Sequence, residues 1–420
     1  MHTRAADLRD AGNRVANRIN GAAMHDLHLL AGSILIAEDL SAINLVELQE
    51  AGIQGFATVL GGPISETAEI ARSLNIPSIG GLEARAVNIP DGTFVILDAS
   101  VGKLHLNPAA EDMANANARL QEMEIEHERN LANAFQPAVT ADNHEIQVMA
   151  NSAGRADVQE AMKMGGDGIG LLPTEYLFIE RRTPPTEDDQ TAEYARIISA
   201  LSPQKPLTIR ALDGSSQMPL PYLPLARETN PALGQRGIRF TLDQPQILRK
   251  QARAVLRASV DTGAAVQFLL PMITTLDQWC VAKELIVAEQ TKLEIEPIPL
   301  GVLIQVPATA ILAEQFAREA DFLTIDTGDL AQYVLAMDYG HPHLAAQVDA
   351  LNPAVLKLID LTLQGAAVHN KPVTITGAIA GDPQAIPILV GLGARQLSVP
   401  PSAIADVKAQ IRSLNLEACR

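Results

Sequence analysis

The stretch PLGVLIQV (299–306), followed by FLTIDTGDL (322–330), decides the fold of this chain. Both segments are near-continuous apolar runs, which is typical of strands buried on both faces of a parallel sheet. The segment between them, 308–319, contains neither glycine nor proline and has the composition of a helix. A strand, a helix and a second strand in this order predict a parallel βαβ unit.

The same alternation fills residues 139–420, which we expect to form one domain. Eight such strands, each followed by a helix, predict a closed (β/α)8 TIM barrel. An open doubly wound sheet is the alternative, but eight units in about 280 residues fit closure better. The other six strand-like runs are EIQVMAN (145–151), GIGLLPTE (168–175), PLTIRALD (206–213), AVQFLLPMI (265–273), PVTITG (372–377) and QLSVP (396–400).

The N-terminal third has a different organisation. Short apolar runs separated by glycine turns predict a small α/β domain over 28–110. Residues 111–138 form a polar segment rich in helix formers, which predicts a long linker helix between two domains. Residues 1–27 read as one amphipathic helix without a fold of its own.

Composition excludes several classes of function. The chain has 420 residues and a formal charge of −17, which disfavours nucleic acid and anionic membranes as partners. It has no apolar run of 18 residues, no secretory signal at the N-terminus and only two cysteines. These features predict a cytoplasmic protein without membrane spans or disulfides. No sequence with the spacing of a phosphate loop or a dinucleotide fingerprint is present, so we expect no nucleotide cofactor.

In TIM barrels the functional residues lie at the C-terminal ends of the strands. We therefore expect Arg210, Asp329 and Arg236 to meet at one mouth, where they could hold a small anion and a hard cation. The alternative is that Arg210 and Asp213 form a rim ion pair and that Asp329 caps a helix. The other strand ends offer Asn151, Thr174, Glu175, Met272, Gln305, Asp326, Thr376 and Pro400.

Six stretches of this sequence carry a resemblance to a known family: GGPISETAEIARSLNIPSI (61–79), GIGLLPTEYLFIERRTPPTEDDQ (168–190), TNPALGQRGIRF (229–240), GVLIQVPATA (301–310), DFLTIDTGDLAQYVLAMDYG (321–340) and GAIAGD (377–382). Through them, nearly the whole chain resembles enzyme I of the bacterial phosphotransferase system, a phosphoenolpyruvate-protein phosphotransferase. Pyruvate phosphate dikinase shares the architecture, but YLFIERRTPPTEDDQ (176–190) favours enzyme I. The resemblance implies a swivelling phosphohistidine domain, a linker helix and a phosphoenolpyruvate-binding barrel that forms a homodimer. It also implies Mg²⁺ and a phosphocarrier protein as partner, and it makes 1–27 the end of the carrier-docking subdomain.

The residues that the resemblance makes catalytic depart from the pattern of the family. Glu66 stands where the family has its phosphoacceptor histidine, and Thr376 stands at the position of the acid cysteine. Of the two metal ligands, Asp329 is present and the glutamate is replaced by Gln305. A carboxylate repels an incoming phosphate, and a single carboxylate holds Mg²⁺ poorly. We therefore expect Mg²⁺ binding to be weakened.

The resemblance assigns substrate binding to Arg210, Arg236 and Asn230, which are all retained. Three cationic contacts are absent, and hydrogen bonds to charged groups contribute about 1.5–3 kcal/mol each. Without these three contacts, the binding free energy of the ligand is smaller by roughly 4–9 kcal/mol. A ligand of ~1 mM affinity has only about 4 kcal/mol of binding free energy, so the loss can abolish its binding. The replaced cationic positions are Pro173, Met218 and Tyr339.

Glu66 has two interpretations. As a residue in the first turn after the candidate N-cap Ser65, it stabilises the helix by ~0.3–1 kcal/mol through the macrodipole. Alternatively, it imitates the charge of a phosphohistidine and fixes the swivelling domain in one posture. The Glu66→Gln exchange separates the two, because only the second predicts a change in domain arrangement and partner binding.

The sequence thus predicts an enzyme I homologue that has lost phosphoryl transfer and acts as a regulatory or scaffold pseudoenzyme. It would bind a protein partner or a small carboxylate. The alternatives are an active metal-dependent barrel enzyme on phosphoenolpyruvate, pyruvate or an oxo-acid, and residual phosphotransferase activity.

Overall fold

The computed structural model describes most of the chain and divides it into two compact units. Unit 1 consists of residues up to Glu128 together with Leu335–Asp349, and unit 2 of Arg129–Val334 and Ala350–Arg420. The helix expected over 1–27 lies outside the described residues. The structure describes residues 32–40, 45, 48–62, 65–179, 181–216, 218, 220, 222–223, 226, 228–341 and 343–420.

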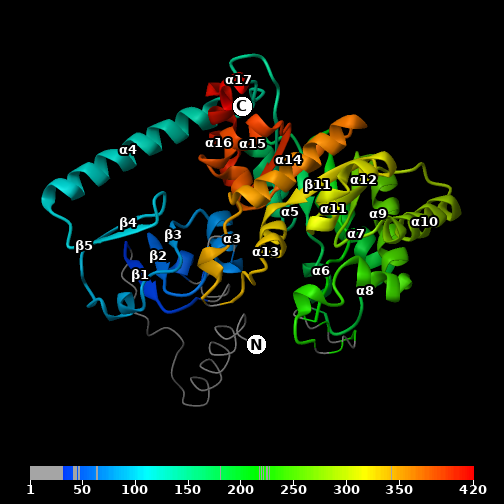
Figure 1. The fold of residues 1–420 in the computed structure, drawn as a ribbon, viewed down its shortest axis with the longest axis horizontal. Coiled ribbons are helices and arrows are strands. Elements are labelled where there is room, and N and C mark those ends of the chain that lie inside the picture. The colour runs from blue at the N-terminus through cyan, green and yellow to red at the C-terminus, as the bar shows by residue number, and fades with distance from the viewer. Residues whose placement is uncertain are drawn as a thin grey trace. The chain divides into compact units, whose positions relative to one another are not determined.

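Unit 2 is built on a closed barrel of eight parallel strands, as the sequence predicts (Figure 1). The strands follow each other around the barrel in chain order, and β13 closes it by pairing with β6, with Leu397 opposite Val148. The strands are β6 (Gln147–Asn151), β7 (Ile169–Leu172), β8 (Leu207–Arg210), β9 (Val266–Leu270), β10 (Leu300–Ile304), β11 (Phe322–Asp326), β12 (Val373–Thr376) and β13 (Gln396–Val399).

The barrel strands are buried because helices cover their outer faces and apolar side chains fill the interior. Leu269 and Leu303 are fully buried and form one cluster with Leu171 and Phe322. The principal helices are α5 (Arg155–Lys163), α7 (Glu187–Ile198), α9 (Pro245–Thr262), α10 (Leu276–Leu293), α14 (Pro353–Val368), α15 (Ala385–Leu392) and α16 (Ile404–Ser413). The other helices of unit 2 include α6 (Tyr176–Ile179), α8 (Ile238–Asp243), α13 (Thr327–Leu335) and α17 (Leu416–Cys419). Short 3-10 helices include η3 (Pro231–Leu233) and η5 (Ala378–Gly381).

One expected helix differs in detail. The segment 308–319 is divided into α11 (Pro307–Ile311) and α12 (Ala313–Glu319), which meet at Leu312. The N–H of Leu312 still bonds to the carbonyl of Ala308 at 3.1 Å. Nothing in the composition of the segment marks this break, because it contains no glycine or proline.

Unit 1 has a three-stranded parallel sheet in the order β1 (Ile34–Ala37), β2 (Gly55–Thr58) and β3 (Ser78–Ile79). Helix α3 (Glu66–Ser73) connects β2 and β3. Phe56 of β2 and Ala71 of α3 are buried in the hydrophobic core of this domain. A separate antiparallel hairpin is formed by β4 (Val95–Asp98) and β5 (Lys103–Leu106). The apolar runs at 33–38, 55–60, 93–99 and 103–108 predict four of these strands, but the sequence analysis misses β3, which is only two residues long. The small domain also contains the 3-10 helix η2 (Ala84–Asn88), and η4 (Ala345–Gln347) lies in the second segment of unit 1.

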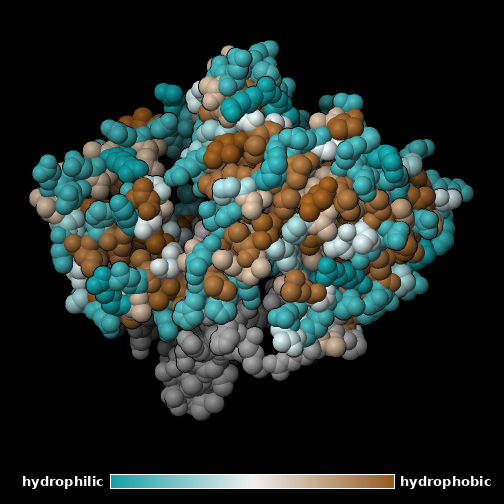
Figure 2. Space-filling model, viewed as in Figure 1, coloured by the Kyte–Doolittle hydropathy of each residue, from teal (hydrophilic) through white to brown (hydrophobic). Residues whose placement is uncertain are grey.

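Helix α4 (Ala110–Ala132) is the long linker helix that the sequence predicts, and it crosses the boundary between the two units. Within the described part of the chain, every helix is too short or too polar to span a bilayer. Figure 2 shows hydrophobic residues scattered among hydrophilic ones on the face in view. Exposed apolar side chains of the barrel helices include Ile311 at 63% and Val368 at 60% exposure. The homodimer stays a prediction.

Candidate active site

The guanidinium of Arg236 joins two carboxylates at the C-terminal mouth of the barrel. Arg236 precedes α8, Asp213 follows β8, and Asp329 lies in the first turn of α13. Nε and Nη2 of Arg236 donate to the two oxygens of Asp213 at 3.0 and 2.9 Å. Nη1 and Nη2 donate to the two oxygens of Asp329 at 3.1 and 2.6 Å. Arg236 thus binds both carboxylates in a fork, the strongest geometry available to this side chain.

Gln305 closes the same cluster from the end of β10. Its amide nitrogen donates to Asp213 at 3.1 Å and to Asp329 at 2.6 Å. Its amide oxygen accepts the backbone N–H of Met272 at 2.7 Å. The Met272 donor fixes which end of the amide is oxygen, because only an oxygen can accept this bond. Gln305 therefore presents N–H groups, and not a free acceptor, to the two carboxylates.

Arg210, at the end of β8, faces Glu175 more closely than Asp213. Its Nη2 lies 3.0 Å from Glu175, and its Nη1 lies 3.8 Å from Asp213. Glu175 also accepts the backbone N–H of Asp213 at 2.7 Å. The alternative of a simple Arg210–Asp213 rim pair is therefore incomplete, because the nearer partner comes from the neighbouring strand.

The residues of this cluster carry a net negative charge. Two guanidiniums face the carboxylates of Glu175, Asp213 and Asp329, so the mouth is net negative without counting Asp326. Burial raises the pKa of the Asp213 carboxyl, but Arg236 and Arg210 outweigh it, and the net pKa lies below its usual range. Burial and then Asp329 raise the pKa of Asp326 to about 6 against the opposing effect of Arg210.

Exchanging Asp326 for asparagine should stabilise the protein, and more so at high pH than at low pH. The folded-state pKa of Asp326 is raised, so native stability falls as the pH rises from about 4 to about 6, and the full cost remains above that window. Asparagine keeps the oxygen that accepts the N–H groups of Gly328 and Asp329 at 3.1 and 3.3 Å. Urea unfolding should show a gain of roughly 3 kcal/mol at pH 8 and about half of that gain at pH 5. Equal gains at both pH values would contradict this assignment.

The residues present do not fit Mg²⁺. Mg²⁺ takes oxygen ligands in octahedral geometry. Here both oxygens of Asp329 accept from Arg236, and Gln305 directs N–H groups at the shared position between Asp213 and Asp329. Among the described residues, no group of three or more His, Cys, Asp or Glu side chains could hold a metal ion. The guanidinium of Arg236 and the neutral amide of Gln305 stand where a divalent ion would have to compensate the carboxylates.

Three further residues that the sequence predicts for the site are Thr376, Asn230 and Glu66. Thr376 ends β12, and its hydroxyl donates to the side-chain oxygen of Asn151 at 2.9 Å, which the Ser398 hydroxyl also approaches at 2.6 Å. Asn230 is exposed at the start of η3. Glu66 is the first residue of α3 in unit 1, directly after the N-cap Ser65, whose Oγ accepts the N–H of Ala68 at 3.3 Å. Ser65 is therefore the N-cap that the sequence predicts.

Two residues of the mouth were missed by the sequence argument. Tyr333 receives a hydrogen bond from Nη1 of Arg236 at 3.3 Å. It follows Asp329 by four residues on α13, and this i, i+4 spacing is a signal that could have found it. Gln251 of α9 donates to Thr174 at 2.9 Å and accepts the N–H of Leu212 at 2.9 Å. No local pattern marks Gln251, because it reaches the mouth from a helix on the outside of the barrel.

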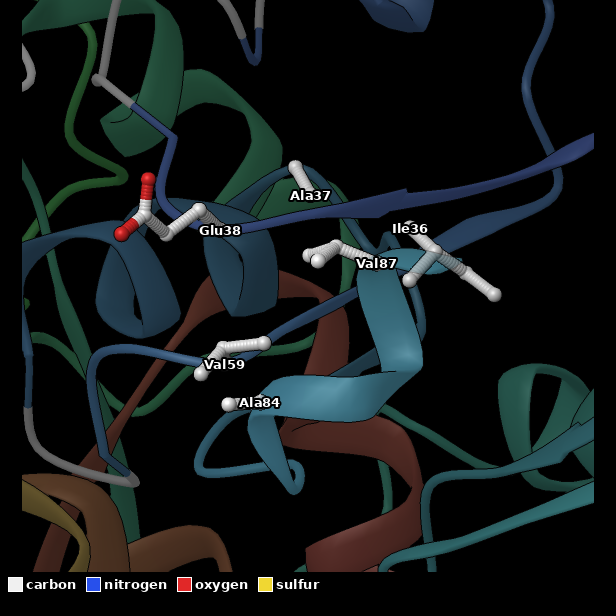
Figure 3. Close-up of a pocket in the computed structure, with 6 residues that line it drawn as sticks. All are labelled: Ile36, Ala37, Glu38, Val59, Ala84 and Val87. Atoms are coloured by element: carbon white, nitrogen blue, oxygen red, sulfur yellow. The ribbon is translucent and has the colours of Figure 1, made fainter. Parts of the chain in front are cut away.

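Unit 1 contains a pocket of about 520 Å³ at the ends of β1 and β2, beside η2 (Figure 3). Its lining is apolar except for one carboxylate and contains none of the predicted site residues. The lining residues are Ile36, Ala37, Glu38, Val59, Ala84 and Val87.

Comparison with known families matches both parts of the chain. Residues 29–102 match the mobile domain of the PEP-utilising enzymes. Residues 127–416 match the PEP-binding domain of the same enzymes.

Curated relatives are similar over nearly the whole chain. The multiphosphoryl transfer protein of Rhodobacter capsulatus is 40% identical over 97% of this chain and 49% of its own length. That of Xanthomonas campestris pv. campestris is 40% identical over 99% of this chain and 50% of its own length. The phosphoenolpyruvate-protein phosphotransferase of Geobacillus stearothermophilus is 36% identical over 99% of this chain and 73% of its own length. The chain thus spans about half the length of the first two relatives.

Proposed function

The chain belongs to the family of PEP-utilising enzymes, and we propose that it is a regulatory or scaffold member that does not transfer phosphoryl groups from phosphoenolpyruvate. One observation carries the proposal: Arg236 and Gln305 already satisfy both Asp213 and Asp329. A phosphoenolpyruvate ligand would need the guanidiniums to be available and the carboxylates to bind Mg²⁺. In this cluster the guanidinium of Arg236 and the carboxylates of Asp213 and Asp329 are already bonded to each other.

Electrostatics supports the same proposal. An anionic ligand would enter a mouth in which three carboxylates already compensate two guanidiniums. Releasing Arg236 from Asp213 and Asp329 would leave two buried carboxylates uncompensated, which costs about 3–5 kcal/mol. This cost is comparable to the whole binding free energy of a millimolar ligand, about 4 kcal/mol. Because Gln305 replaces the acidic ligand expected from the family resemblance, Mg²⁺ does not offset that cost.

Glu66, in unit 1, is a second argument for the loss of phosphoryl transfer. It occupies the position at which the resemblance places the phosphoacceptor, and it begins α3. A carboxylate there yields at best a labile acyl phosphate. We propose that the partner is a protein, a phosphocarrier or another component of the phosphotransferase system, and that the protein is a cytoplasmic homodimer. The net charge of −17 is compatible with a basic partner surface.

Calorimetric titration with phosphoenolpyruvate, with and without Mg²⁺, tests the proposal. We expect no binding heat at millimolar ligand under either condition, because Arg210 and Arg236 are paired with carboxylates and no acidic cluster among the described residues could hold the metal. The Geobacillus stearothermophilus relative serves as the control for ligand quality. Sub-millimolar, Mg²⁺-dependent binding to this chain would overturn the proposal and restore an enzymatic role for Arg210, Arg236 and Asp329.

A further inference from the structure

A segment from the barrel sequence belongs to the mobile-domain unit. Leu335–Asp349 lies between α13 and α14 in sequence, yet it clusters with unit 1. We call this segment the strap. It contains η4 (Ala345–Gln347), and two of its apolar residues, Ala345 and Val348, are only 2% and 1% exposed. A short connecting segment buries such residues only when a surface lies against it.

Four glycines of unit 1 provide that surface. A Cβ on Gly62 would lie 2.2 Å from the carbonyl oxygen of Ala345, and a Cβ on Gly81 would lie 2.9 Å from the Cβ of Ala346. A Cβ on Gly80 would lie 3.3 Å from the backbone of Gly61, so the two glycine turns also pack on each other. We call Gly61, Gly62, Gly80 and Gly81 the glycine seat. Any side chain at Gly62 would displace the strap.

We infer that the glycine seat is a docking surface whose occupant is the strap of the same chain. Hydrogen bonds within the strap hold it in a turn. The N–H of Ala345 bonds to the carbonyl of His341 at 2.9 Å, and the side-chain amide of Gln347 bonds to the carbonyl of His343 at 2.9 Å. These bonds form a turn that presents Ala345 and Ala346 to the seat. Small side chains on the strap and none on the seat allow the two backbones to approach closely.

The docked strap lies beside the start of α3. The carbonyl of Gly62 accepts both the N–H and the hydroxyl of Ser65, at 3.1 and 2.8 Å. Ser65 is the N-cap of the helix that begins with Glu66. A partner that contacts this turn therefore competes with the strap. In sequence, the strap follows α13 and precedes α14.

A designed disulfide tests the inference. In a background with Cys280→Ser and Cys419→Ser, we would combine Gly81→Cys with Ala346→Cys and oxidise the full-length chain under mild conditions. The Cβ separation of 2.9 Å is within about 1 Å of the mean for disulfides, so an intramolecular bond is expected in most molecules. The matched control is Gly92→Cys with Ala346→Cys, because Gly92 has the same φ of +79° and open space around it. Equal cross-linking of the two pairs would overturn the inference.

A second variant measures release of the strap. Gly62→Ala should raise amide hydrogen exchange of residues 343–349 by about tenfold or more, because the new Cβ cannot coexist with the docked Ala345 carbonyl. Gly154→Ala is the control, since a Cβ there meets nothing within 4 Å. Both proteins should keep their helical circular dichroism. Unchanged exchange in Gly62→Ala would contradict docking, and this outcome is independent of any phosphoenolpyruvate binding.

Discussion

Replacing Arg236 by methionine lowers the free energy of unfolding by about 3–5 kcal/mol, because it leaves buried carboxylates without their counter-charge. Asp213 and Asp329 are each about 5% exposed, and the fork of Arg236 reaches all four of their oxygens. Gln305 remains as a neutral donor to both, but two amide hydrogens cannot compensate two charges. For a domain of this size the loss corresponds to a drop in Tm of about 10 °C.

The pH dependence identifies the cause of this loss. Arg236 holds the pKa of Asp213 below its usual range. Without it, burial raises that pKa, so the variant should lose more stability at pH 8 than at pH 5, where protonation relieves the charge. The measurement is thermal unfolding of both proteins at the two pH values.

Arg318→Met is the control for the loss of an arginine as such. Its side chain is 64% exposed and pairs with Glu319 at 3.4 Å, so its removal should change stability by less than about 1 kcal/mol. If Arg236→Met behaved like Arg318→Met, or if its loss did not depend on pH, Arg236 would not hold the cluster together. In that case the guanidinium would be available to a ligand, and the proposed function would lose its main support.

The barrel could be predicted from the sequence because its signal is local. Strands such as β10 and β11 are apolar over their whole length, since both faces are buried, and each is separated from the next by a helix. The positions of Arg210, Gln305 and Asp329 at one mouth follow from the fold alone, because parallel strands bring their C-terminal ends together. The sequence argument therefore found most of the residues of the site.

The pairing of these residues could not be predicted in the same way. Whether Arg210 faces a ligand or Glu175 depends on distances between two strands, which sequence spacing does not contain. The orientation of the Gln305 amide depends on the N–H of Met272, a residue with positive φ at the end of β9. The association of Leu335–Asp349 with unit 1 depends on the close approach of glycine backbones that are far away in sequence.

Exchanging Gln305 for glutamate should destabilise the protein and make its stability depend on Mg²⁺. The exchange removes two donors to charged groups, each worth about 1.5–3 kcal/mol, and adds a third carboxylate beside Asp213 and Asp329. In EDTA we expect a loss of roughly 3–6 kcal/mol. The same three carboxylates now present oxygen ligands in place of an N–H donor, so millimolar Mg²⁺ should recover part of the loss by binding the native state.

Gln305→Met separates the two effects, because it removes the donors without adding a charge. It should be destabilised, and Mg²⁺ should not restore it. The wild-type protein should show the same Tm in EDTA and in Mg²⁺, since Gln305 directs its amide nitrogen at the position between the carboxylates. A wild-type Tm that rises with Mg²⁺ as much as that of Gln305→Glu would mean that the mouth binds the ion as it stands. The amide would then have to turn away from the carboxylates at the expense of its bond to Met272.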